Sequence, residues 1–424
     1  MGTRAGVVVT GTEVLTGRVS DRNGPWLAEE LRRLGVDIGQ IVVVGDRPGD
    51  LAGALEHLAA SGVDLILTSG GLGPTADDLT AAVVAEFQGR PSELDEALEQ
   101  RIGEIVARLS AGRGWQTDPA ATAAATRKQA LVPVGADVLA PVGTAPGLVV
   151  PVADGRTGPP IVVLPGPPFE LQGMWPAVTT NAVVLAAIEG RRELRQRTVR
   201  LWRTPESELA ATLRAHHDRL DGLEITTCLR SGELEIVTRF APEAQPAYDA
   251  LHAALTEAHG EVMFSPDGRT IDEIVTDALL EQGATIATAE SCTAGLLAAR
   301  LTDRPGSSAY VLGGLVVYSN EAKHELAGVD PALIERVGAV SPEVAEALAR
   351  GARARLGADI GVGITGVAGP DGGTDDKPVG LVHLCVSRDG RTIPRRAMIP
   401  GGRADVRARS VLVAMHMLRE LLLG

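Results

Sequence analysis

Residues 63–80 read VDLILTSGGLGPTADDLT, and this stretch decides the fold class. Val63–Thr68 is an apolar run typical of a buried strand, and a helix is expected after Asp78. A strand that passes through a glycine-rich turn into a helix is a typical unit of a parallel α/β sheet. The glycines let backbone N–H groups approach an anion, and the helix N-terminus adds a favourable dipole. The stretch therefore predicts a phosphate-binding loop at the edge of such a sheet.

The same rhythm continues on the N-terminal side of this loop. Val7–Thr10 and Ile41–Val44 are expected strands, and Leu27–Leu34 and Leu51–Leu58 carry the apolar spacing of helices. Strands alternating with helices imply a mostly parallel sheet covered on both faces. Residues 1–175 are therefore predicted to form a doubly wound α/β domain.

Residues 176–268 have a different pattern, which predicts a small α+β module. Its expected strands and helices are Thr198–Trp202, Pro205–Ala215, Leu223–Leu229, Glu233–Phe240 and Glu243–His259. A hairpin turn is expected at Ser231-Gly232. The module has no cluster of catalytic residue types, so a spacer or dimerisation role is the favoured interpretation.

A third unit is expected over residues 269–424, again of α/β type. Four apolar runs are its predicted strands: Thr285–Ala289, Val311–Tyr318, Ile360–Thr365 and Gly380–Val386. An apolar stripe over Ala294–Leu301 predicts a helix directly after the first of them. A second helix is expected to begin at Ser341-Pro342 and to end at Gly357.

Composition narrows the class of protein. The chain has 424 residues, 45% of them hydrophobic, which suits two or three aliphatic cores and excludes a disordered protein. A net charge of −14 leaves no broad basic face, so no nucleic-acid partner is expected. Three distant cysteines match no disulfide framework, and no signal-peptide pattern or membrane-spanning apolar stretch is evident. We expect a cytoplasmic protein with no membrane association.

The first group of candidate residues surrounds the glycine loop. Asp46 follows another strand, and parallel strands bring their carboxyl ends to one edge of the sheet. Aspartates beside a pyrophosphate can hold a hard divalent cation. Glycines and aspartates also make ordinary turns and helix caps, which is the alternative. The predicted phosphate-binding residues are Gly70, Gly71, Gly73 and Thr75, and the predicted metal ligands are Asp46, Asp77 and Asp78.

The second group begins with Ser291, which lies where a strand meets a helix. A serine there is exposed as a nucleophile, and N–H groups of the first helical turn are expected to form an oxyanion hole. The serine needs a base, for which Lys323 is the candidate, three residues after an expected N-cap at Asn320. Bringing the pKa of a lysine from about 10.4 to near 7–8 costs roughly 4 kcal/mol. A helix dipole supplies at most about 1–2 kcal/mol of this, so Lys323 must be buried, with Tyr318 as its polar neighbour.

Two rivals for these roles remain open on the residues alone. Cys292 is intrinsically the better nucleophile, although the helix stripe favours a packing role for it. His324 is the commoner type of base, but it points about 100° away from Lys323 around their shared helix.

The N-terminal motifs resemble the molybdopterin-binding domain found in molybdenum-cofactor enzymes and in the N-terminal half of CinA proteins. They are GTEVLTG (11–17), VGDRPGD (44–50), TSGGLGPTADDLT (68–80) and LPGPPFEL (164–171). The resemblance implies metal-dependent hydrolysis of ADP-ribose, with Asp46 and Asp78 as functional aspartates. Asp21-Arg22-Asn23 departs from the Asn-Thr-Asn common in that family.

The C-terminal motifs resemble the CinA C-terminal domain, a nicotinamide-nucleotide amidase. They are TAESCTAG (288–295), GSSAYVLGGLVVYSNEAK (306–323), GAVSPEVA (338–345), ITGVAGPDGG (364–373) and KPVG (377–380). The resemblance implies Ser291 as nucleophile, Tyr318 and Lys323 as its activating partners, and Thr365 as a further catalytic residue. Arg403, Gly366 and Gly369 are implied in substrate binding. No cofactor is expected in this half.

The favoured hypothesis is a bifunctional, homodimeric hydrolase of nicotinamide mononucleotide and ADP-ribose that requires a divalent metal ion only in its N-terminal domain. Two alternatives remain. One is a non-catalytic nucleotide-binding scaffold linked to competence. The other gives the N-terminal half a molybdopterin adenylyltransferase activity.

Overall fold

The computed structural model describes residues 2–113, 118–230 and 232–424 of the chain. The chain divides into two compact units. One consists of Met1–Arg195 with Ala241–Glu243, and the other of Gln196–Phe240 with Ala244–Gly424. The α/β class predicted from the sequence is confirmed in both.

The N-terminal unit is built on a six-stranded sheet whose order is β2-β1-β3-β8-β7-β6. The first four strands in that order run parallel, β7 is antiparallel to β8, and β6 is antiparallel to β7. The strands are β1 (Arg4–Thr10), β2 (Asp37–Val44), β3 (Leu65–Ser69), β6 (Asp137–Leu139), β7 (Gly147–Val150) and β8 (Ile161–Leu164). The glycine loop follows β3, so it lies at the carboxyl ends of the parallel strands, as expected.

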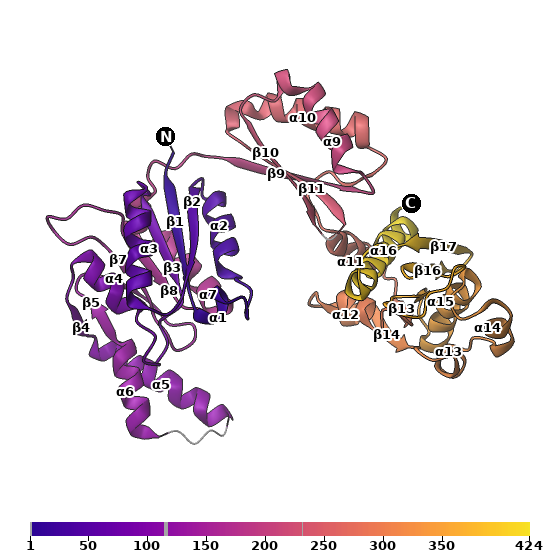
Figure 1. Ribbon diagram of the computed structural model, residues 1–424, viewed down its shortest axis with the longest axis horizontal. Helices are drawn as coiled ribbons and strands as arrows, with labels where there is room; N and C mark the ends of the chain where they lie inside the picture. Colours follow the sequence, from indigo (N-terminus) through magenta and orange to yellow (C-terminus); the bar gives the residue numbers. More distant parts are fainter. Residues whose placement is uncertain (1, 114–117, 231) are drawn as a thin grey trace. The chain divides into compact units, whose positions relative to one another are not determined.

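Alternation along β1 explains why helices cover both faces of this sheet (Figure 1). Val7 and Val9 pack into one core, and Val8 packs into the other. The first core is closed by α2 (Asn23–Arg33), α7 (Pro168–Thr180) and α8 (Ala182–Ala187). The second is closed by α3 (Pro48–Ala60) and α4 (Thr80–Gln88). The expected domain boundary at 175 lies within α7, and the core continues to Ile188.

Shorter elements complete the N-terminal unit. The short helix α1 (Thr12–Leu15) follows β1. The strands β4 (Ser92–Leu94) and β5 (Leu131–Pro133) pair in a separate two-stranded sheet beside α5 (Glu96–Arg113) and α6 (Pro119–Gln129).

The second unit begins with a small α+β module around a four-stranded sheet of order β10-β11-β9-β12. These strands are β9 (Arg195–Trp202), β10 (Leu223–Arg230), β11 (Glu233–Phe240) and β12 (Met263–Ser265). The helices α9 (Glu206–Ala215) and α10 (Gln245–His259) pack on it around Leu209, Leu251 and Leu255. Of the expected turn, Ser231 lies outside the described residues.

The same unit ends in a five-stranded sheet of order β14-β13-β15-β16-β17. Three strands are parallel, namely β13 (Ile286–Glu290), β14 (Val311–Val316) and β15 (Ile360–Gly366). The sheet continues with β16 (Leu381–Arg388), which is antiparallel to β15, and β17 (Arg391–Met398), which is antiparallel to β16. The edge formed by the ends of β13, β14 and β15 is therefore the place for a site.

Helices cover both faces of the five-stranded sheet as well (Figure 1). One core contains α11 (Ile271–Glu281), α12 (Leu296–Thr302) and α16 (Arg403–Leu423). The other contains α13 (Asn320–Ala327), α14 (Pro331–Val337) and α15 (Pro342–Leu356). Gly361 and Gly363 let α15 approach β15 closely, because a Cβ atom at either position would collide with a carbonyl oxygen of α15.

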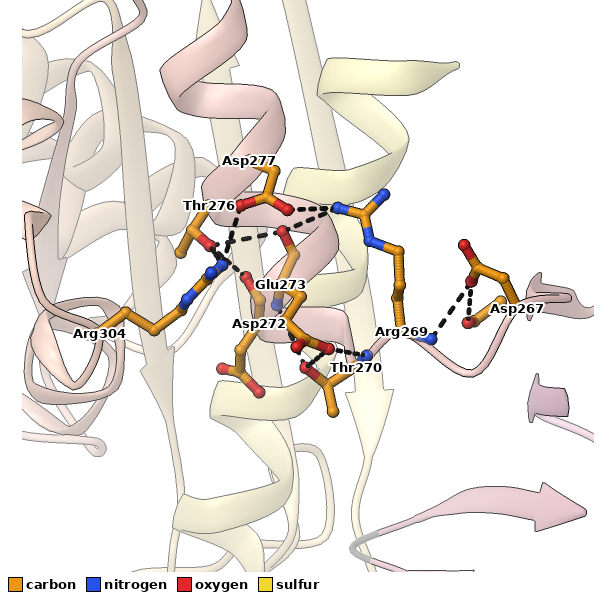
Figure 2. A network of polar contacts seen from close by, with 9 residues as sticks. Asp267, Arg269, Thr270, Asp272, Glu273, Thr276, Asp277 and Arg304 are labelled. Carbon is orange, nitrogen blue, oxygen red and sulfur yellow. Dashed lines mark hydrogen bonds and ion pairs between the residues drawn. The ribbon is translucent and has the colours of Figure 1, made fainter. Parts of the chain in front are cut away.

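Polar contacts fix the start of α11, as Figure 2 shows. Thr270 and Glu273 form a capping box, in which each side chain binds the other's backbone N–H. Asp277 then accepts from Arg269 at 2.6 Å and from Arg304 at 3.0 Å. These bonds anchor the segment that leads from β12 into the C-terminal sheet.

Candidate functional sites

Ser291 lies at the carboxyl edge of the C-terminal sheet. It is 8% exposed and therefore buried, not exposed as the sequence predicts. Its backbone N–H donates to the carbonyl oxygen of Ile364 in β15 at 2.9 Å. On the other side, Val317 donates to the carbonyl oxygen of Glu290 at 2.8 Å. Ser291 is thus held between the ends of β14 and β15, which carry Tyr318 and Thr365. The strands bring these three predicted site residues to one edge.

The loop after Ser291 is organised by the carboxylate of Glu290, which is fully buried. One oxygen accepts from the backbone N–H groups of Gly295 and Leu297, both at 3.0 Å. The other accepts from Ala298 at 2.9 Å. A carboxylate without a cationic partner tolerates burial when N–H donors point at it, and the start of a helix provides them.

This arrangement corrects the expected oxyanion hole. The first-turn N–H groups assigned to it are already bonded to Glu290, so they do not face a substrate oxygen. The helix also begins later than its apolar stripe predicts, at Leu296, because Ala294 (φ 50°) and Gly295 (φ 91°) have left-handed backbone. The sequence pattern misplaced the start because Ala294 has the right spacing but a turn conformation.

The opposite wall of the loop comes from α16. Arg407 donates through Nε to the carbonyl oxygen of Cys292 and through Nη2 to that of Thr293, both at 3.1 Å. The segment next to the nucleophile is therefore tied at its carbonyl groups by an arginine and at its N–H groups by Glu290. Both clamps were missed by the sequence analysis.

Lys323 is almost completely buried, with 2% of its surface exposed. Its Nζ donates to the carbonyl oxygens of Val317 at 3.0 Å and Tyr318 at 3.1 Å. Burial lowers the pKa of Lys323, which outweighs the opposing influence of Cys292 and Glu321. The side chain thus meets the requirement of a lysine base, which is to lose its proton more readily than a free lysine.

The N-cap of α13 differs from the prediction. Ser319, and not Asn320, caps the helix, since its Oγ accepts from the N–H of Ala322 at 3.1 Å. Both residue types cap helices well, so the sequence could not separate two adjacent candidates.

Arg403 links two of the predicted site segments. Its Nη2 donates to the hydroxyl of Tyr318 at 3.0 Å, and its Nη1 donates to the carbonyl oxygen of Gly369 at 2.8 Å. Tyr318 is 59% exposed, so its ring faces solvent beside the arginine. Gly366 ends β15, directly after Thr365, whose hydroxyl donates to the carbonyl oxygen of Ala339 at 2.8 Å.

The structure argues against the two rival residues. Cys292 belongs to the core under α12, and its burial raises the pKa of the thiol to about 11. It therefore stays a thiol at neutral pH and cannot act as a ready nucleophile. His324 bonds through Nδ1 to the carbonyl oxygen of Val329 at 3.0 Å. It lines a separate pocket between α13 and α14 that does not include Ser291, Tyr318 or Thr365.

The N-terminal unit contains an open cleft of about 370 Å³ at the edge predicted for its site. Its walls come from the ends of β1, β2, β3 and β8, together with the loop before β7 and the first turn of α7. Among the predicted residues, six line it: Asp46, Gly70, Gly71, Gly73, Asp77 and Asp78. The seventh, Thr75, lies outside the lining and donates from both its N–H and its hydroxyl to Asp78.

Glycine is required at the first two loop positions. Gly70 (φ 105°) and Gly71 (φ 68°) adopt left-handed backbone, which favours glycine. A Cβ atom at Gly70 would also meet the carbonyl oxygen of Thr10. The loop thus packs against β1 as backbone and keeps its open side toward the cleft.

The cleft is strongly acidic. Its described lining contains five carboxylates, from Glu13, Asp46, Asp77, Asp78 and Glu170, and no Lys, Arg or His side chain. Asp46 and Asp78 each use one oxygen within the fold, accepting at 2.8 Å from the N–H of Thr12 and Thr75 respectively. A cation that enters with an anion would offset the repulsion between the anion and these carboxylates.

The carboxylates of the cleft are possible ligands for a metal ion. Among the described residues, no three His, Cys, Asp or Glu side chains form a ready metal-binding group. Magnesium, however, is often bound by one or two carboxylates, with waters and substrate phosphates completing its shell. Asp46 and Asp78 fit that mode, because both line the cleft and both are only partly exposed.

Two residues near the cleft received no role from the sequence. Asn23 donates from Nδ2 to the Oγ of Ser69 at 2.8 Å and to the carbonyl oxygen of Gly166 at 2.6 Å, joining the ends of β3 and β8. Glu170 lines the cleft from the first turn of α7. The sequence could have indicated Glu170, because it is an acidic residue in the LPGPPFEL motif and in the first turn of a helix.

Within the described parts of the chain, no helix combines the length and apolarity that crossing a membrane requires.

Known proteins resemble this chain in both halves. A family model described as "CinA C-terminal domain" matches residues 268–422, and one described as "Probable molybdopterin binding domain" matches residues 6–183. Among solved structures, a competence/damage inducible protein of Agrobacterium tumefaciens is 40% identical. That match covers 36% of this chain and 94% of the other, with a TM-score of 0.35.

Curated relatives match over the whole length. The CinA-like protein of Mycolicibacterium gilvum is 59% identical over 428 residues, covering 100% of both chains. The CinA-like protein of Mycobacterium tuberculosis is 56% identical, covering 99% of this chain and 98% of the relative. Since more than half of all positions agree across both halves, the chain belongs to the CinA family.

Proposed function

We propose that the C-terminal site hydrolyses the carboxamide of nicotinamide mononucleotide to nicotinic acid mononucleotide and ammonia. The observation that carries this proposal is the buried Lys323, whose pKa is lowered by desolvation at the sheet edge that presents Ser291. An exposed lysine would keep its ordinary pKa and stay protonated at neutral pH. Membership of the CinA family supports an enzyme with this domain.

The reaction uses the site residues as follows. Neutral Lys323, relayed by Tyr318, accepts the hydroxyl proton of Ser291 while Oγ bonds to the carboxamide carbon. The C–N bond then breaks, and the proton passes to the leaving nitrogen, which departs as ammonia. Water attacks the resulting ester, gives a proton back to the serine oxygen and releases the carboxylic acid. Arg403 and the Gly366–Gly369 loop would hold the substrate phosphate.

The direct test is ammonia release from nicotinamide mononucleotide by the purified chain. We expect turnover without added metal, and unchanged turnover in the presence of a chelator. A chain that binds the nucleotide but releases no ammonia would instead support the nucleotide-binding scaffold.

For the N-terminal site we propose hydrolysis of the pyrophosphate of ADP-ribose to AMP and ribose 5-phosphate. The supporting observation is a phosphate-type glycine loop in a cleft lined by five carboxylates and no basic side chain among its described residues. Asp46 and Asp78 would hold a divalent cation, and the cation would supply positive charge to offset the negative charge of the phosphates.

Hydrolysis of ADP-ribose should therefore require magnesium or manganese and stop when the metal is chelated. Supplying molybdopterin and ATP in parallel tests the adenylyltransferase alternative. Adenylylated pterin without ADP-ribose cleavage would favour that alternative.

A further inference from the structure

Glu170 is set apart from the other carboxylates of the N-terminal cleft by its burial. It is 8% exposed, and its Oε2 is buried with no hydrogen-bond partner among the described residues. Gly143 makes room for the carboxyl group, since a Cβ atom there would collide with it. Buried polar atoms without a partner are rare in folded proteins and call for an explanation.

The other acids have different surroundings. Glu13 and Asp77 are exposed, and Asp46 and Asp78 are partly exposed and bonded to loop N–H groups. Those two bonds hold the strand-end loops in place. The cleft therefore contains carboxylates in two kinds of surroundings. Asp46 and Asp78 are partly exposed and bonded to N–H groups, whereas Glu170 is buried and its Oε2 has no partner among the described residues.

The burial of Glu170 also affects its pKa. Burial raises the pKa of Glu170, and the N–H of Gly143 opposes the rise only in part. The charged groups that line the cleft with it are Glu13, Asp46, Asp77 and Asp78, none of which favours a negative Glu170. A carboxylate with a raised pKa binds a proton more tightly once it is ionised, which makes it a better general base.

We propose that Glu170 is the general base that accepts a proton from the water attacking the pyrophosphate in this cleft. In that step the water oxygen bonds to one phosphorus and the bond from that phosphorus to the bridging oxygen breaks. The bridging oxygen leaves on the second phosphate, and the water proton passes to the carboxylate of Glu170 and then to solvent. The inference rests on the proposed pyrophosphatase function.

The activity test compares wild type with Glu170→Gln at saturating metal. Glutamine keeps the shape but cannot accept the proton, so kcat should fall by about 10²–10⁴-fold. KM and the half-saturating metal concentration should change by less than about threefold. The rise of kcat with pH on the acid side should disappear. Glu56→Gln, on the exposed surface of α3, is the matched control and should keep wild-type values.

A second measurement needs neither metal nor activity. A carboxyl whose pKa is higher in the folded than in the unfolded protein stabilises the fold below the unfolded pKa, and this contribution is lost as pH rises through the folded pKa. The Tm of metal-free wild type should therefore fall relative to that of Glu170→Gln as pH rises from 4 to 8. Glu56→Gln should show no such trend.

The outcomes separate the two claims. Wild type that does not cleave ADP-ribose with any divalent metal overturns the proposed function and this role with it. Cleavage that persists at the wild-type kcat in Glu170→Gln overturns the base alone. A raised KM at unchanged kcat would make Glu170 a substrate-binding residue, and a pH-independent Tm difference would contradict its raised pKa.

Discussion

The two candidate sites occupy the same place in their sheets and differ in how they treat charge. The N-terminal cleft gathers carboxylates in an open space, where Asp46 and Asp78 remain partly exposed. The C-terminal site buries one carboxylate, Glu290, and one amine, Lys323, each surrounded by backbone groups. The first arrangement suits a cation taken from solution, whereas in the second arrangement burial lowers the pKa of a lysine. Both sites thus lie at the carboxyl edge of a sheet, and they differ in how far their charged side chains are buried.

The strongest test of this contrast is Ser291→Ala. Losing the nucleophile should reduce ammonia release by at least about 10³-fold. ADP-ribose cleavage should change by less than about twofold, because the sites lie in separate units. Both activities are measured on one preparation, so each controls for folding. Activity that survives in Ser291→Ala and disappears in Cys292→Ala would assign the role to the cysteine.

Lys323→Arg should have the next largest effect. Arginine stays protonated and cannot act as a base, so kcat for the amidase should fall by about 10²–10⁴-fold. In wild type the rate should rise with pH through a group that titrates below a free lysine, because burial lowers the pKa of Lys323 and only its neutral form accepts a proton. His324→Gln is the control and should retain wild-type rates. An active Lys323→Arg enzyme would contradict the general-base role.

Glu290→Gln tests whether the buried carboxylate orients the nucleophile loop. The introduced NH2 group would face backbone N–H donors, and leaving buried donors unsatisfied costs about 1–3 kcal/mol. We expect kcat to fall about 10–100-fold with KM little changed, in line with an interaction lost at the reacting centre. The measurement pairs amidase kinetics with thermal unfolding. A variant with a lower Tm but an unchanged kcat would reduce Glu290 to a purely structural role.

The smallest effect is expected for Asp78→Asn. Asparagine still accepts a hydrogen bond from Thr75, so the loop should keep its shape. The loss of one negative charge should raise the half-saturating magnesium concentration by about tenfold, on the order of 1.4 kcal/mol. Titrating ADP-ribose cleavage with magnesium gives the value, amidase activity shows that the preparation is sound, and thermal unfolding reports on the fold of the N-terminal unit. Wild-type metal dependence would show that Asp78 only braces the glycine loop.

Much of this molecule follows from its sequence. The alternation of apolar strands, glycine turns and helical stripes fixed the α/β class, because both periodicities are local. Glycines before a helix located the phosphate-type loop, and the need for a lowered pKa required that Lys323 be buried, as it is. Family motifs placed Tyr318 and Arg403 in one site, and the structure shows them hydrogen bonded at 3.0 Å.

Tertiary structure alone decided the rest, because donors and burial come from segments distant in the chain. The helix start at Leu296 and the capture of its N–H groups by Glu290 depend on a turn that apolar spacing does not encode. The clamp of Arg407 on Cys292 spans 115 residues, beyond any local pattern. The buried Oε2 of Glu170, which has no hydrogen-bond partner among the described residues, arises only where α7 closes against the loop at Gly143. The sequence determined which charged side chains are present, and the tertiary structure determined which of them are buried and what they bind.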